Sequence, residues 1–452
     1  MSFPAYPDYK HSGIELLPEY PSHWALKRFK NVFEERAERS SDGSEELLSV
    51  SAYFGVKPRS ETLDEGDHLS RAESLEGYKV CRAGDLVINI MLAWNRGLGF
   101  SWQHGIVSPA YSVFHVTDGS YPKFLDYLVR SDEYIRYFKT HSAGIMDSRL
   151  RLYPESFGRL FSVIPPACEQ TQIARFLDHE TARIDALIEE QQRLIELLKE
   201  KRQAVISHAV TKGLDPTAPM KDSGVEWLGE VPAHWQVKRL KHLVPSITVG
   251  IVVEPSKYYV DDGVPALRSL NVKPGAVVAE NLVYLSEESN ELHAKSKILE
   301  GDIVAVRSGQ PGTAAIVPLE FNGANCIDLI VIRKPLQGCS TFIFWYLNSD
   351  AALKQFSEGT SGAIQQHFNI AAASEMLFAW PPASEQLEIN SHLDRACHQL
   401  DRLISVAGES KSLLLERRSA LISAAVTGKI DVRDWQPPAS TQAPKLEVAE
   451  AD

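Results

Sequence analysis

The stretch Pro165-Pro-Ala-Cys-Glu-Gln-Thr-Gln-Ile-Ala-Arg-Phe-Leu177 decides the fold, because its pattern returns 216 positions later as Pro381-Pro-Ala-Ser-Glu-Gln-Leu-Glu-Ile-Asn-Ser-His-Leu393. Both copies continue without a gap to an Ala-Val-Thr triplet, at 209 to 211 and at 425 to 427. No Pro or Gly occurs from Glu169 to Lys212, and apolar residues recur at steps of three and four. This period predicts a long helix in each copy.

The two predicted helices are expected to pair with each other as an antiparallel coiled coil. A helix of about forty residues rises roughly 60 Å, so most of its apolar stripe needs a partner of similar length. The alternative is two unrelated amphipathic helices packed on separate domains, which the gapless repeat disfavours. The expected seam consists of Leu177, Ile184, Leu187, Leu194, Leu198, Val205, Leu393, Leu400, Leu403, Leu414 and Leu421.

A second repeat opens each half of the chain. Residues 11 to 30 align with residues 222 to 241 at an offset of 211, and eleven of the twenty positions are identical. Each copy contains Pro-x-His-Trp, with His23 and Trp24 in the first and His234 and Trp235 in the second. A tryptophan in such a position is typical of a core, so we interpret these pairs as structural, with a functional site as the alternative.

The rest of each half mixes strand and helix patterns. Apolar, β-rich runs predict strands at 47 to 54, 85 to 91, 105 to 116, 264 to 272, 302 to 307, 314 to 317 and 326 to 333. Helical spacing occurs at 121 to 141 and at 340 to 356. The predicted class is α+β, with two mixed α/β domains in pseudo-twofold tandem repeat, each followed by a long helix. The expected divisions are 1–163 and 216–380 for the domains, 164–215 and 381–431 for the helices, and 432–452 for a disordered tail.

Composition narrows the class of protein. The 452 residues carry a net charge of -12 and five scattered cysteines without a C-x-x-C pair, which suits a reducing compartment and no structural zinc. Neither a membrane-length apolar run nor a signal-peptide core is visible, so we expect a cytoplasmic protein. Motifs for phosphate loops, dinucleotide binding, zinc proteases, acyl transfer and methyl transfer are missing, and no metal site is expected. The acidic balance by itself disfavours DNA binding, but residues 130 to 159 hold six cations against four acids.

Several motifs in order resemble the DNA specificity subunit of type I restriction-modification systems. These are Asp215-Pro216, Met220-Lys-Asp-Ser-Gly-Val-Glu-Trp-Leu-Gly229, Val231-Pro-Ala-His-Trp235, the two Pro-Pro-Ala-x-Glu-Gln starts and the two Ala-Val-Thr ends. Fragments inside the halves look like two target-recognition domains: Leu48-Ser-Val-Ser, Tyr53-Phe-Gly-Val, Asp85-Leu-Val-Ile-Asn89, Ala93-Trp-Asn-Arg-Gly-Leu-Gly99, Gly105-Ile-Val-Ser-Pro-Ala-Tyr111, Gly263-Val-Pro-Ala-Leu-Arg268 and Asn271-Val272. The likeness covers nearly the whole chain.

The resemblance implies a non-catalytic subunit that reads a bipartite target in double-stranded DNA. It implies that each domain reads one half-site, that the paired helices act as a spacer, and that two methyltransferase subunits bind, with restriction or translocase subunits joining them in antiviral defence. S-adenosylmethionine, ATP and Mg would then be bound by those partners, and this chain would need no cofactor. The alternatives are a self-contained restriction or modification enzyme, or a coiled-coil scaffold that binds other proteins.

Base reading needs Arg, Lys, Asn, Gln or Ser side chains placed at base edges, and such residues are most informative on loops with a Gly nearby. Candidates in the first domain are Asn89, Asn95, Arg96, Lys139, Arg149 and Arg151. Candidates in the second domain are Arg268, Ser269, Asn271, Arg307, Ser308, Gln310, Gln365, Gln366 and His367. A solvated surface residue is the alternative for each one.

Overall fold

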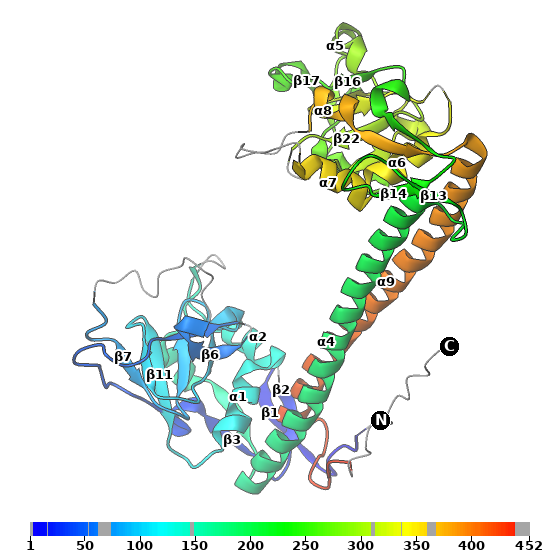
Figure 1. The fold of residues 1–452 in the computed structure, drawn as a ribbon. Helices are drawn as coiled ribbons and strands as arrows, with labels where there is room; N and C mark the ends of the chain where they lie inside the picture. The colour runs from blue at the N-terminus through cyan, green and yellow to red at the C-terminus, as the bar shows by residue number, and fades with distance from the viewer. Residues whose placement is uncertain are drawn as a thin grey trace. The chain divides into compact units, whose positions relative to one another are not determined.

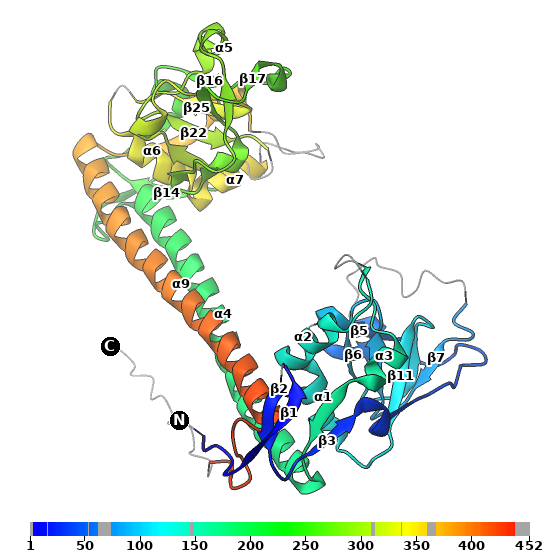
Figure 2. The same cartoon turned by 180° about the vertical axis from the view of Figure 1, so that it is seen from behind.

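The chain forms two compact units, each of which combines one mixed α/β domain with parts of both long helices. The structure, a computed structural model, describes residues 3–15, 17–52, 54–61, 74–144, 149–308, 312–335, 337–358 and 368–438. The first unit comprises 1–191 and 409–452, and the second comprises 192–408. The helices are α4 (Ala167–Lys212) and α9 (Ala383–Val426), and in each unit a segment of one lies beside a segment of the other (Figures 1 and 2).

A four-stranded antiparallel sheet forms the centre of the first domain. Its strand order is β4-β11-β8-β9, with bounds Phe33–Glu35, Tyr111–Val116, Leu86–Asn89 and Leu98–Phe100. The domain also contains two-stranded pairs: β1 (Tyr9–Ile14) with β2 (Leu17–Pro21), β3 (Ala25–Arg28) with β12 (Phe161–Ile164), β5 (Leu48–Ser51) with β6 (Gly55–Pro58), and β7 (Lys79–Cys81) with β10 (Gly105–Val107). The helices are α1 (Pro122–Arg130), α2 (Asp132–Thr140) and α3 (Pro154–Arg159).

The second domain contains an equivalent four-stranded antiparallel sheet. Its sheet has the order β16-β25-β22-β23, with bounds Ile247–Val249, Leu329–Ile332, Ile303–Val306 and Ala314–Ile316. The pairs β13 (Met220–Asp222) with β14 (Glu230–Pro232) and β15 (Gln236–Arg239) with β26 (Leu377–Trp380) match those of the first domain. A mixed sheet has no counterpart among the described strands of the first domain: it consists of β17 (Tyr259–Val260), β21 (Val283–Leu285), β18 (Val264–Leu267) and β24 (Asn325–Cys326). The remaining elements are β19 (Val272–Lys273), β20 (Ala276–Val277), α5 (Glu287–Leu292), α6 (Ser340–Leu347), α7 (Asp350–Glu358) and α8 (Ile370–Glu375).

The equivalent strands β8 and β22 are buried along their whole length, which explains their continuous apolar sequences. A buried aspartate precedes each strand, Asp85 at 3% exposure and Asp302 at 2%. Each carboxylate accepts a backbone N–H three residues earlier, from Arg82 and Leu299, and also pairs with an arginine. The fold class and its internal repeat, both predicted from the sequence, are therefore confirmed.

Several predicted elements were too long. The predicted strand at 105 to 116 is two strands that belong to different sheets, and the predicted helix at 121 to 141 breaks at Ser131, whose hydroxyl donates to the carbonyl of Leu128 at 2.8 Å. The predicted helix at 340 to 356 breaks at the equivalent position, where Ser349 donates to the carbonyl of Tyr346 at 2.6 Å. The predicted strand at 326 to 333 is interrupted at Asp328, which has φ of 50°. A side chain that satisfies a backbone carbonyl, or a left-handed residue, ends an element inside an apolar run.

The two sequence repeats bind each other inside each unit. In the first unit, Glu169 accepts hydrogen bonds from His23 Nε2 at 2.8 Å and Trp24 Nε1 at 3.0 Å. In the second, Glu385 accepts them from His234 Nε2 at 2.7 Å and Trp235 Nε1 at 3.0 Å. The Pro-x-His-Trp pairs thus anchor the starts of α4 and α9.

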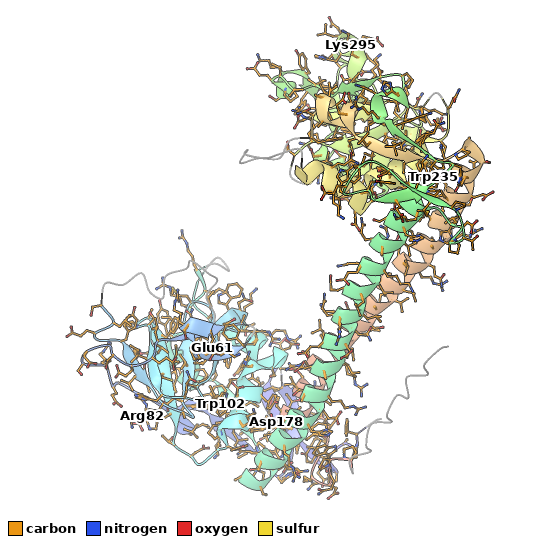
Figure 3. All side chains as sticks on the ribbon, viewed as in Figure 1. Glu61, Arg82, Trp102, Asp178, Trp235 and Lys295 are labelled. Carbon is orange, nitrogen blue, oxygen red and sulfur yellow. The ribbon has the colours of Figure 1, made fainter. Side chains whose placement is uncertain are left out.

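The end of the opposite helix covers each anchoring tryptophan. Trp235 lies beside the C-terminal end of α4, where a Cβ on Gly213 would lie 3.3 Å from its ring (Figure 3). A Cβ on Gly428, just past α9, would lie 3.2 Å from the ring of Trp24. The Gly residues after the Ala-Val-Thr ends therefore permit close packing on both indoles.

Within each unit the helix segments run antiparallel. In the first unit, Arg418 makes a bidentate pair with Asp185 at 2.7 and 3.1 Å, while Gln172, nearer the start of α4, donates to the carbonyl of Val432 beyond the end of α9. In the second unit, Arg202 lies 2.8 Å from Asp401.

The phase of the helical seam differs from the prediction at three positions. Leu187, Leu194 and Leu403 are 45%, 43% and 46% exposed. Their neighbours Ile188, Ile195 and Ile404 are less exposed and take these positions of the seam. The less exposed residues of α4 follow steps of four and three through Ile184, Ile188, Gln191, Ile195, Leu198, Arg202 and Val205. Leu177, Ile184, Leu393 and Leu400 are buried, and Leu198, Val205, Leu414 and Leu421 are partly buried.

Candidate nucleic-acid interface

In the first unit, the end of β8 and the loop after it carry three of the predicted residues, and these have different surroundings. Asn89 is buried at 5% exposure, and its Oδ1 accepts the Met91 N–H at 3.1 Å. It also hydrogen-bonds the hydroxyl of Tyr111, whose pKa is raised mainly by burial. Asn89 therefore supports the loop from below and does not reach its surface.

Arg96 turns back toward the helices. Its φ is 62°, and its guanidinium donates to the carbonyl of Arg130 at 2.6 Å and pairs with Asp132. It borders a hollow of about 520 Å³ that Arg130 and Arg418 also line. Asn95, one residue earlier, is exposed.

Asn95 lines the same hollow as Arg96, and its neighbour Trp94 contacts one of the other three cations predicted in this domain. Lys139, on the last turn of α2, lies with Nζ 5.3 Å from the ring centroid of Trp94. Ala143 and Arg151 exchange two backbone hydrogen bonds of 2.9 Å, and Leu152 N–H donates to the carbonyl of Ile90 at 2.9 Å. These contacts join the loop after β8 to the segment that carries Arg149 and Arg151.

We call the exposed side of this loop, of the end of α2 and of the segment with Arg149 the first basic surface. It is defined by Trp94, Asn95, Lys139, Arg149 and Arg151. Arg149 and Arg151 are exposed and form no ion pair with the residues that the structure describes. Exposed apolar side chains border it: Met91 at 41%, Leu92 at 44% and Tyr153 at 40%. The sequence prediction included the cations of this surface and missed its aromatic residues. A tryptophan inside a polar loop that contains Gly was a signal that could have identified Trp94.

In the second unit, Asn271 is a structural residue. It is fully buried, its Oδ1 accepts the Arg268 N–H at 2.9 Å, and its Nδ2 donates to the carbonyls of Val278 at 3.0 Å and Glu280 at 2.8 Å. The Arg268 side chain donates to the carbonyl of Asn281 at 2.5 Å. Ser269, between them, is partly exposed.

Backbone hydrogen bonds gather three loops at one edge of the second domain. Ile251 N–H donates to the carbonyl of Cys326 at 2.9 Å, Ile327 N–H to that of Leu267 at 2.8 Å, and Asp328 N–H to that of Ile251 at 3.1 Å. Arg307, directly after β22, pairs with Asp328 at 2.6 Å. The loops after β16, β18 and β22 therefore meet at this edge.

We call this edge the second loop surface, defined by Val252, Val253, Ser269, Leu270 and Arg307. Val253 is 77% exposed, Val252 is 48% and Leu270 is 41% exposed. Ser308 follows Arg307 and is partly exposed. The predicted residues Gln310, Gln365, Gln366 and His367 lie outside the described residues.

A metal site and a membrane-spanning helix are both absent from the described part of the chain. No three His, Cys, Asp or Glu side chains among those residues are placed to hold a metal ion. No helix there is both long and apolar enough to cross a membrane.

The relatives found by comparison with known proteins are of one kind, specificity subunits of type I restriction enzymes. No family model matches the chain. The specificity subunit of the type I restriction enzyme MjaVIII from Methanocaldococcus jannaschii is 24% identical over 368 residues, which are 77% of this chain and 81% of that protein. The EcoKI specificity subunit from Escherichia coli is 27% identical over 186 residues, 41% of this chain and 37% of that protein.

Solved structures agree in fold. A chain from a study of complex assembly and conformational transition of the type I R-M system has a TM-score of 0.68 at 17% identity, covering 91% of this chain and 99% of that one. The HsdS subunit from Thermoanaerobacter tengcongensis has a TM-score of 0.52 at 18% identity, covering 91% and 98%. The resemblance predicted from the sequence is thereby confirmed.

Proposed function

We propose that this chain, which resembles type I specificity subunits along most of its length, reads a bipartite DNA target and directs methyltransferase and restriction subunits to it. The observation that carries the proposal is the duplication. Two units share one sheet order, yet the loops that follow the equivalent strands β8 and β22 differ in sequence and surroundings. One scaffold with two different loop sets suits the reading of two different half-sites.

The surfaces have the chemistry that base reading needs. Sequence is read by side chains that reach base edges, whereas cations on phosphates fix position. In the first unit, Asn95 offers an amide, Lys139 offers a cation beside Trp94, and Arg149 and Arg151 offer two further exposed cations. In the second unit, Ser269 and Arg307 lie between exposed apolar side chains, and a phosphate or base that bound Arg307 would replace Asp328.

The catalytic steps belong to partner subunits in this proposal. We expect S-adenosylmethionine to bind the two methyltransferase subunits, and ATP and Mg to bind the restriction subunits, with assembly in the cytoplasm. The net charge of -12 weakens binding to DNA by this chain alone, so we also expect partners to contribute phosphate contacts.

A domain exchange tests the modular part of the proposal. Residues 31 to 160 are replaced by the matching part of a relative, and the methylated sites of cells that express the chimera with its methyltransferase partner are sequenced. We expect one half-site to change and the other to remain. A change in both half-sites, or in neither, contradicts independent reading by the two domains.

Matched arginine variants test the first basic surface. The double variant R149A/R151A removes two exposed cations, and R175A removes one exposed cation from α4, outside the surface. Each lost phosphate contact lowers the slope of log affinity against log salt by about 0.9. We therefore expect the double variant, in complex with its partner, to lose up to about two units of slope and R175A to lose none. A scaffold that binds only proteins would show no such slope for DNA in any variant.

A further inference from the structure

The anchors at the starts of the two long helices differ in one respect. Glu169 is 4% exposed and accepts hydrogen bonds from three side chains, because the Tyr6 hydroxyl joins His23 and Trp24. The side chain of Glu385 is 24% exposed, and its two donors both bind Oε2. Glu385 Oε1 accepts no hydrogen bond from the residues that the structure describes. Among the described residues, the second anchor therefore has no equivalent of Tyr6.

The offset of 211 identifies the residue in that place. Ser22 N–H donates to the carbonyl of Asp8 at 3.0 Å, and Ala233 N–H donates to that of Pro219 at 2.7 Å. Lys10 and Lys221 likewise bind the carbonyls of Trp24 and Trp235. At the same offset Tyr6 corresponds to Thr217.

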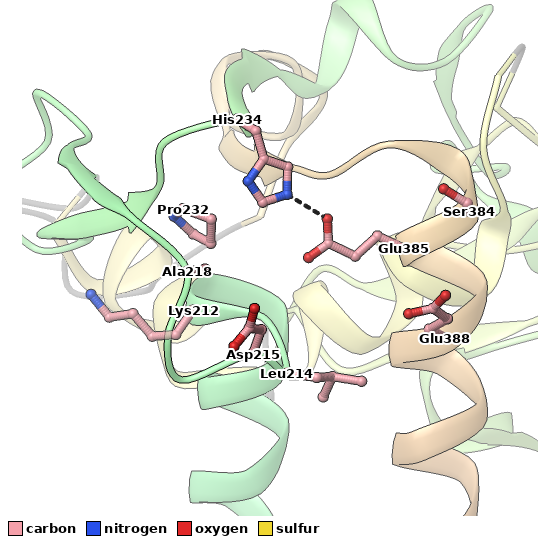
Figure 4. A pocket seen from close by; sticks show the side chains of 9 residues that line it. All are labelled: Lys212, Leu214, Asp215, Ala218, Pro232, His234, Ser384, Glu385 and Glu388. Carbon is pink, nitrogen blue, oxygen red and sulfur yellow. Dashed lines mark hydrogen bonds and ion pairs between the residues drawn. The ribbon is translucent and has the colours of Figure 1, made fainter.

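Thr217 cannot replace the phenol, since its side chain is short and its hydroxyl donates to Asp215 at 2.6 Å. A pocket of about 480 Å³ remains beside Glu385 (Figure 4). That volume is in the range of sites for small organic groups. Its lining residues are Lys212, Leu214, Asp215, Ala218, Pro232, His234, Ser384, Glu385 and Glu388. In Figure 4, His234 is hydrogen-bonded to one carboxylate oxygen of Glu385, and the other oxygen points into the space next to the end of α4.

The first unit shows how a phenol fits such a place. The Tyr6 ring meets Trp24 edge to face at 5.8 Å and lies 5.5 Å from the His23 ring. The Arg433 guanidinium lies 5.1 Å from the Tyr6 ring centroid. Burial and the hydrogen bond to Glu169 raise the pKa of Tyr6, so its hydroxyl remains a donor.

We propose that the Glu385 pocket binds a tyrosine side chain presented by a partner polypeptide, with the phenol donating to Glu385 Oε1 and the ring lying against His234. The rim carries Asp215 and Glu388, while Lys212 is held by the carbonyl of Glu230. This acidic rim favours a segment with an arginine or lysine next to the tyrosine, as Arg433 lies over Tyr6 in the first unit. The proposal rests on the internal repeat and is independent of which bases the protein reads.

A peptide probe tests the pocket in the full chain. The probe is a fluorescent peptide with the sequence of residues 3–10, Phe-Pro-Ala-Tyr-Pro-Asp-Tyr-Lys, and its binding is followed by anisotropy. We expect E385Q to weaken binding about tenfold, because a neutral amide replaces the charged acceptor of the phenol. A peptide with Phe in place of its first Tyr should bind the unmodified chain about as weakly as the original peptide binds E385Q. The affinity of this Phe peptide should fall little further in E385Q.

Two further variants separate the pocket from general damage. E169Q, at the equivalent anchor of the first unit, should leave peptide affinity unchanged. A218W fills the pocket from its lining without touching the Glu385 anchor, and should weaken binding at least tenfold while the melting temperature holds. The proposal is overturned if the peptide does not bind at millimolar concentration, if E385Q and A218W bind it as the unmodified chain does, or if the phenol hydroxyl makes no difference.

Discussion

The sharpest test of the internal repeat is the removal of its two anchoring carboxylates, one at a time. E169A takes the acceptor from Tyr6, His23 and Trp24, and E385A takes it from His234 and Trp235. The tyrosine and both tryptophans are buried, at 3%, 1% and 0% exposure. The histidine side chains are 38% and 49% exposed, so water can replace their partner. E169A therefore leaves two buried donors without an acceptor, and E385A leaves one.

The magnitudes follow from that count. A buried donor left without a partner costs about 1–3 kcal/mol, so E169A should destabilise the first unit by about 4 kcal/mol and E385A the second by about 2 kcal/mol. For units of this size, 1 kcal/mol lowers the melting temperature by roughly 2–4 °C. E169A should then lower the melting of the first unit by roughly 10 °C, and E385A should lower that of the second unit by about half as much.

Calorimetry gives the shifts, and hydrogen exchange read by mass spectrometry shows which unit is affected. Faster exchange should concentrate in β3 and β12 for E169A, and in β15 and β26 for E385A. E169Q retains one neutral acceptor and should fall between E169A and the unmodified chain. Equal decreases in melting temperature for the two alanine variants, or a larger decrease for E385A, would refute the reasoning from buried donors without an acceptor.

Three other predictions follow from particular contacts. N271A removes three hydrogen bonds from a fully buried amide and should cost about 3 kcal/mol in thermal unfolding, whereas S269A should change stability by less than about 0.5 kcal/mol and alter DNA binding instead. I188S should destabilise the first unit by about 1–2 kcal/mol and L187S by less than about 0.5 kcal/mol, measured in the same way, because Ile188 lies on the seam and Leu187 is 45% exposed. Burial raises the pKa of Tyr6, Tyr127, Tyr134 and Tyr346 above their unfolded value of about 10, so the stability they contribute is present below about pH 10 and lost as pH rises further. Circular dichroism and tyrosinate absorbance should then show one cooperative alkaline transition, and tyrosinate formation without unfolding would contradict it.

The fold was largely predictable because the repeats are long and their order is fixed. A gapless 216-residue offset over the helices and eleven identities in twenty at the openings leave little choice about which segments correspond. The limits of the strands were harder to predict, because one residue ends them. Ser131 and Asp328 interrupt apolar runs through a single hydrogen bond or a single left-handed φ, and periodicity averages over such positions.

Three of the eleven seam residues were predicted one position out of phase for a related reason. Leucines at 187, 194 and 403 have isoleucines directly after them, so two overlapping stripes fit the same sequence. The pairing of Asp185 with Arg418 and of Arg202 with Asp401 selects the isoleucine stripe, and single-sequence periodicity contains no information about a partner helix.

The candidate interface shows what residue type alone cannot distinguish. Asn89 is the last residue of β8 and Asn95 lies in the loop that follows; both were predicted to read bases, yet the first is buried beneath the loop and the second is exposed on it. Asn271 and Ser269 divide in the same way in the second domain. An amide is as well suited to satisfy backbone groups under a loop as to meet a base edge, so the distinction needs coordinates.

The two compact units do not coincide with the two halves of the sequence, and the anchoring tryptophans show why. Trp24 shares its core with Ala425 and Val426, at the end of the second helix, and Trp235 shares its core with Ala209 and Val210, at the end of the first. Residues 1–215 alone would leave the face of Trp24 uncovered, even though they contain a whole helix copy. Because the ends of the two helices have the same Ala-Val-Thr sequence, the end of the first is chemically suited to cover that face. A chain of 1–215 should therefore be poorly folded when dilute and become ordered with concentration as copies exchange helix ends, whereas a domain stable by itself would unfold at a concentration-independent temperature.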